Sequence, residues 1–109
     1  MTQEIFGSKW QDDVVALACE NADLDVATSG TDTLIVRAVF GGAIASQRKD
    51  NSNFTFAVVD APASTATGTT VDTSGVVKAG SQAGVAVVQV VLTDVPDVAP
   101  AFVTVTVTG

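Results

Sequence analysis

Histidine and tyrosine are absent from this 109-residue chain, and cysteine occurs once, as Cys19. Without an imidazole, the usual general base and the Ser-His-Asp arrangement are excluded. A single cysteine closes no intramolecular disulfide and does not supply the Cys and His ligands of a zinc site. We therefore expect no enzymatic activity and no cofactor or metal, and we predict that Cys19 is a small, unreactive core residue.

Basic residues are also scarce: five Lys and Arg stand against twelve Asp and Glu, and the formal charge is −7. Nucleic-acid phosphates and anionic membrane surfaces repel such a chain, so neither is an expected partner. No apolar run approaches the ~20 residues that span a bilayer. Residues 1–10 lack the basic and apolar regions of a secretory signal, and we expect the protein to fold in the cytoplasm.

Acidic residues occur in local pairs, which is a pattern that can bind Ca²⁺ or catalyse glycoside hydrolysis. The pairs are Asp12 with Asp13, Asp23 with Asp25, and Asp94 with Asp97. The oxygen-rich segment 50–53 lacks the spacing and the closing Glu of an EF-hand loop. We interpret all of these residues as solvated loop charges, and the polar segment 47–53 as a loop.

Valine, alanine and threonine dominate what is present, and apolar residues make up 47% of the chain. Branching at Cβ favours extended strands, and alternation of apolar with polar residues is the strand period. The strand candidates are residues 14–19, 33–40, 53–59, 84–92 and 102–108, with two short pieces in 71–77 around a turn at Gly75. For residues 12–22 a short helix is the rival interpretation.

The expected core follows from the alternation in these segments. The predicted inward residues are Leu34, Val36, Ala38, Phe40, Ala86, Val88, Val90, Leu92, Val103, Val105 and Val107. Glycine at position 75 can supply the positive φ of a tight reversal. About seven short strands separated by turns, with no helix between them, predict an all-β sandwich or barrel.

Segment 71–77, followed by Ala79 and by 84–88, resembles the "VDssGvVtA…aGtatIta" pattern of the bacterial immunoglobulin-like group 2 family (BIG2 domains). Segment 103–107 is similar to the closing strand of that family. Segments 30–34 and 53–56 resemble two earlier strands, with Phe56 where the family usually has Trp. The resemblance covers about residues 14–108. It implies an immunoglobulin-like two-sheet sandwich over 14–109, preceded by an arm, residues 1–13, that matches nothing in the family.

Two features of the sequence suggest a surface for partners. On segment 84–92 the outward positions are also mostly apolar, whereas an ordinary sandwich carries polar residues there; scattered surface valine is the alternative interpretation. The arm carries large apolar groups that either dock on another subunit or fold back on their own domain. The candidate partner-binding residues are Ile5, Phe6, Trp10, Val85, Val87 and Val91.

Domains that resemble BIG2 are common in capsid and tail proteins of tailed bacteriophages and in bacterial surface adhesins. The resemblance, together with the start Met and the missing signal, implies a virion structural protein assembled in the host cytoplasm. We expect a capsid decoration (cement) or tail accessory subunit that binds major capsid or tail proteins, with homo-oligomers possible. The alternative is a cell-surface adhesion module that binds carbohydrate or a receptor through segments 47–53, 64–70 and 94–100.

Overall fold

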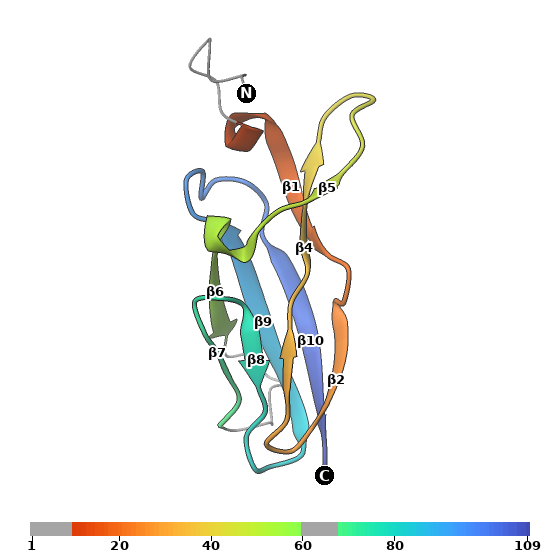
Figure 1. Ribbon diagram of the computed structural model, residues 1–109, viewed down its shortest axis with the longest axis vertical. Coiled ribbons are helices and arrows are strands. Elements are labelled where there is room, and N and C mark those ends of the chain that lie inside the picture. Colours follow the sequence, from red (N-terminus) through yellow and green to blue (C-terminus); the bar gives the residue numbers. More distant parts are fainter. Residues whose placement is uncertain (1–9, 60–67) are drawn as a thin grey trace.

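The computed structural model describes residues 10–59 and 68–109 and has an all-β fold, an immunoglobulin-like sandwich (Figure 1). Two short 3-10 helices, η2 (Trp10–Asp13) and η3 (Asn51–Asn53), accompany the strands. The strands are β1 (Val14–Cys19), β2 (Asp23–Ala27), β3 (Thr31–Thr33), β4 (Val36–Phe40), β5 (Gln47–Arg48), β6 (Phe54–Val59), β7 (Thr70–Val71), β8 (Val76–Lys78), β9 (Gly84–Leu92) and β10 (Ala101–Thr108). No helix in the described ranges is long and apolar enough to cross a membrane.

One layer of the sandwich, here called the back sheet, is continuous and has the strand order β2-β10-β9-β6. Strand β10 runs antiparallel to β9 and parallel to β2, and β6 runs antiparallel to β9. The inward residues of β9 and β10 are at most 2% exposed, apart from Ala101 at the start of β10. Their alternation confirms the predicted core of this layer.

The other layer, here called the front layer, is divided into two three-stranded sheets, β1-β4-β5 and β3-β8-β7 (Figure 1). Segment 33–40, predicted as one strand, is interrupted at Leu34 and Ile35. The chain changes partners there, because β3 pairs with β8 whereas β4 pairs with β1 and β5. The predicted inward side chains of this segment, Leu34, Val36, Ala38 and Phe40, are all buried.

Two segments differ from the sequence-based predictions. Asp23 and Asp25, interpreted as loop charges, are the outward residues of strand β2, whose inward residues Leu24 and Val26 are buried. The alternating pattern of β2 is only five residues long. The strand that pairs with β2 is β10, which lies about eighty residues later in the chain, as the register Thr104↔Asp23 shows. Segment 47–53, interpreted as a loop, contains β5 and η3. At residues 14–19 the strand forms and not the rival helix.

The turn between β7 and β8 connects two neighbouring strands of the front sheet β3-β8-β7. Gly75 has φ +78°, as the sequence predicted for the reversal. The Asp72 carboxylate accepts hydrogen bonds from the backbone N–H of Ser74 at 2.8 Å and of Val76 at 3.0 Å. This arrangement satisfies the turn locally, which is the usual reason for aspartate at such a position.

Candidate binding surfaces

On strands β6, β9 and β10, the side of the back sheet that faces away from the core carries mostly apolar residues, and we call this part of the sheet the outer face. At its centre the outward residues of β9 are half-buried: Val85, Val87, Gln89 and Val91. The paired strands β6 and β10 add Thr55, Ala57, Val59, Phe102, Thr104 and Thr106. None of these ten side chains carries a charge, in a protein whose formal charge is −7. The outer face is therefore the uncharged part of an acidic molecule.

Phe102 is the most prominent side chain of this surface, because it is 55% exposed. It lies opposite Gln89 in the β9–β10 register. Val87 and Val91 occupy the diagonal positions, within reach of an aromatic ring. Phe102 was not among the residues predicted from the sequence; the available signal was a large aromatic residue in the outward phase of the 102–108 alternation.

An acidic margin borders the outer face on β2. Asp23 and Asp25 are both exposed and lie beside Thr104 and Thr106 of β10. Neither carboxylate has an ion-pair partner within residues 10–59 and 68–109. A partner that covers the outer face near β2 therefore needs basic or neutral groups at that margin.

Trp10 lies on its own domain. It is half-buried and packs against the core cluster. The Lys49 ammonium stands 4.5 Å from the centroid of its ring and 6.0 Å from that of Phe40, within the range of cation–π attraction. Ile5 and Phe6, the other candidates in the arm, lie outside the described residues, as does most of segment 64–70.

Ion pairs tie the upper part of the front layer together. Glu20, just after β1, accepts from Arg37 of β4 at 2.6 Å and from Arg48 of β5 at 2.5 Å and 2.7 Å. These hydrogen bonds, first from Arg48 and then from Arg37, lower the pKa of the Glu20 carboxyl to about 2. Arg37 also donates to the side chain and the carbonyl of Ser46. The cluster therefore fastens three strands and a loop.

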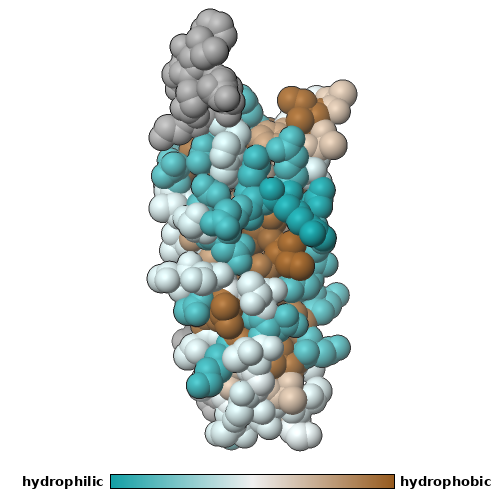
Figure 2. All heavy atoms as spheres, viewed as in Figure 1, coloured by the Kyte–Doolittle hydropathy of each residue, from teal (hydrophilic) through white to brown (hydrophobic). Residues whose placement is uncertain are grey.

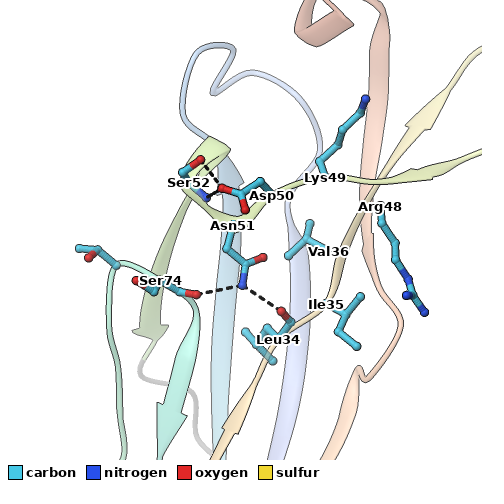
Figure 3. A pocket seen from close by; sticks show the side chains of 10 residues that line it. Leu34, Ile35, Val36, Arg48, Lys49, Asp50, Asn51, Ser52 and Ser74 are labelled. Atoms are coloured by element: carbon cyan, nitrogen blue, oxygen red, sulfur yellow. Dashed lines mark hydrogen bonds between the residues drawn. The ribbon is translucent and has the colours of Figure 1, made fainter.

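An open groove of about 670 Å³ lies where the two front sheets meet (Figure 3). Asn51 spans it, and its Nδ2 donates to the carbonyl oxygens of Leu34 at 3.0 Å and Ser74 at 2.9 Å. Asp50 accepts from the backbone and the hydroxyl of Ser52, and these bonds lower the pKa of the Asp50 carboxyl. Figure 3 shows Arg48 and Lys49 directed away from the groove. The hydrogen bonds of Asn51 thus connect η3 with both front sheets across the groove.

Cys19 is half-buried at the margin of the core, against which it packs. Burial raises the pKa of its thiol to about 11. The thiolate fraction near neutral pH is then very small, which makes the thiol a poor nucleophile. Within the part of the chain that the structure describes, no group of three or more His, Cys, Asp or Glu side chains is placed to hold a metal ion.

Hydrophobic side chains on the front layer form small separate patches among hydrophilic ones (Figure 2). On the outer face of the back sheet, by contrast, the strand register places apolar residues such as Val59 and Val87 next to one another. A comparison with models of known protein families finds no match, and a comparison with curated proteins finds none either.

Proposed function

We propose that this chain is a non-enzymatic virion structural protein, a bacteriophage capsid decoration or tail accessory subunit that binds other virion proteins. The observation that carries the proposal is the outer face, with Phe102 exposed among Val87 and Val91 and no charge on three adjacent strands. Aromatic side chains, Phe included, are enriched at the centres of protein interfaces, and charged residues are depleted there.

The chemistry of the side chains supports a binding role. Histidine, the usual general base, is missing from the sequence, and the carboxylates of Asp50 and Glu20 are engaged in hydrogen bonds or ion pairs. The resemblance to BIG2 domains supports a virion by analogy. In a symmetric lattice many copies act together, so a modest contact through one outer face is sufficient for stable attachment.

Binding to particles tests the proposal directly. Phage particles that lack this subunit are mixed with purified protein, and the bound fraction is measured by co-sedimentation. We expect Phe102→Glu to weaken binding at least about tenfold, because it places a charge at the centre of the interface. Ile44→Glu is the matched control: Ile44 is 59% exposed but lies between β4 and β5, so binding should not change.

Mass spectrometry of purified virions supplies the second measurement. A structural subunit should be present at a copy number comparable to that of a capsid or tail protein. Binding to glycans together with absence from every particle would contradict the proposal and favour the adhesion alternative.

A further inference from the structure

The back sheet ends in two edges of opposite character. Strand β2 forms one edge and carries Asp23 and Asp25 among five residues. Strand β6 forms the other edge, and its sequence, FTFAVV, contains no charge, no proline and no glycine. Exposed strand edges pair with other chains unless charges, prolines or bulges block them. Edge β2 carries such charges, whereas the six residues of edge β6, Phe54–Val59, carry none.

The hydrogen-bond pattern shows which backbone groups of β6 are available. Hydrogen-bonded pairs alternate along an antiparallel ladder. The carbonyl of Asn53 accepts from Thr93 N–H at 3.1 Å, so Thr55 and Ala57, at the following odd positions, also direct their backbone groups toward β9. Phe56 and Val58 therefore direct theirs away from the sheet.

At the start of the strand only part of the edge is free. The N–H of Phe54 donates to the carbonyl of Asn51, while the carbonyl of Phe54 points outward with the groups of Phe56 and Val58. No described residue is recorded as a partner of these outward groups. With respect to the described residues, the outward groups of β6 are thus three acceptors and two donors, centred on Phe56.

This set of groups is self-complementary. In an antiparallel pair of two β6 strands centred on Phe56, each Phe56 donates to and accepts from Phe56 of the second copy. Each Val58 N–H meets the carbonyl of Phe54 of the second copy, which uses every outward donor. Val58, 39% exposed, and the half-buried Phe56 would both be covered by the second strand.

Charge favours β6 over β2 for such pairing. A second copy also carries a formal charge of −7, so contact is least unfavourable where charged side chains are absent. Two β2 strands paired about Asp25 would place like charges directly opposite, which is destabilising. Two β6 strands place no charge opposite another.

We propose that β6 of a second copy of this chain pairs antiparallel with β6, about a two-fold axis that passes between the two Phe56 residues. The two back sheets then form one continuous eight-stranded sheet. The proposal does not depend on the virion assignment. The pairing joins the outer faces of the two copies into one surface of twice the width. A symmetric dimer therefore presents two Phe102 side chains to whatever it binds.

Sedimentation equilibrium of the full chain tests the pairing. The mass should rise from 11.0 kDa toward twice that value as concentration increases. Val58→Pro removes an outward N–H and leaves the bonds to β9 intact, since proline is tolerated on edge strands. It should weaken dimerisation at least about tenfold. Val58→Ala is the control: it also removes the valine side chain but keeps the backbone N–H, and this variant should still dimerise.

A disulfide test reports the register and does not depend on the proline variant. In the proposed pair Thr55 lies opposite Ala57 of the second copy in a non-hydrogen-bonded position, with Cα atoms about 4.5 Å apart, which suits a disulfide. Thr55→Cys/Ala57→Cys should form a covalent dimer on mild oxidation, and Thr55→Cys alone should not. The native Cys19, with its raised pKa, should contribute little.

Three results would overturn the proposal. The first is a chain that stays monomeric up to about 1 mM. The second is a dimer that Val58→Pro leaves unchanged and that the cysteine pair does not link. The third is a one-to-one complex with a different virion protein on β6, which would assign the edge to another partner.

Discussion

The two layers of the sandwich are held together by different means. In the back sheet, β9 and β10 are paired along seven registered positions, and their inward valines are almost fully buried. In the front layer, β5 and β7 are two residues long and β3 is three. The back sheet is therefore one continuous backbone ladder, whereas in the front layer only β1 and β4 pair over five positions and side-chain hydrogen bonds connect the shorter strands.

The side chains that join the front layer stand where its ladders stop. Asn21 accepts from Ile35 N–H and donates to the carbonyl of Thr33, while Asn51 connects Leu34 with the turn before β8. Few backbone bonds remain to compensate if one of these contacts is lost. Single substitutions should therefore affect the front layer strongly, and three predictions test this, from the largest expected effect to the smallest.

Gly75→Ala should produce the largest loss of stability. An added Cβ would lie 2.6 Å from Asn51 Nδ2 and 2.9 Å from Phe56 Cζ, at a φ that side chains rarely adopt. Strain and overpacking together predict about 2–4 kcal/mol, measured by urea unfolding. Gly42→Ala is the control, because Gly42 has φ +69° with open space around it, and it should lose only about 1 kcal/mol. Equal losses would mean that the crowded junction is not rigid.

Asn51→Ala should have an intermediate effect. The carbonyls of Leu34 and Ser74 lose their donor, and we expect about 1–2 kcal/mol of destabilisation with faster amide exchange in β3 and β8 than in β9. In Asn53→Ala the lost bond goes to the exposed carbonyl of Asp50, and about 0.5 kcal/mol or less is expected. Uniform exchange changes in both layers would contradict the independence of the front layer.

Glu20→Gln should have the smallest effect, and one that depends on pH. The folded-state pKa of Glu20, about 2, lies below its ordinary value of 4.5, so the carboxylate contributes stability above pH 4.5 that is lost as pH falls toward 2. Urea midpoints measured across this window should fall less steeply for the variant than for the wild type. High salt should reduce the difference, since these groups are exposed. Identical pH profiles would show that the cluster does not stabilise the folded state.

Sequence patterns predicted the parts of the fold that repeat a local rule. The alternation in β9 and β10 was sufficient to identify their inward residues, and Gly75 marked the turn between β7 and β8. The division of segment 33–40 was not predictable, because it depends on which strands lie beside it. Strand β2 was missed for the same reason: parallel pairing with a strand at the opposite end of the chain leaves no local signal.

The candidate surfaces were predictable only in part. Val85, Val87 and Val91 were selected from their outward phase, and the structure places them at the centre of the outer face. Phe102 and the edge of β6 required knowledge of the strand order, since nothing in the sequence alone says which strand ends a sheet. Trp10 was assigned by its type, whereas its contact with Lys49 depends on the three-dimensional fold.

The parallel pairing of β2 with β10 has a mechanical consequence. The helical turn η2, which precedes β1, and the C-terminus lie toward opposite ends of the molecule (Figure 1), so tension applied between them acts along these two strands. Five registered residue pairs join the strands, and they would be loaded together in shear rather than opened one at a time. We therefore expect the contact between β2 and β10 to resist such a pull more strongly than strands whose hydrogen bonds open one after another.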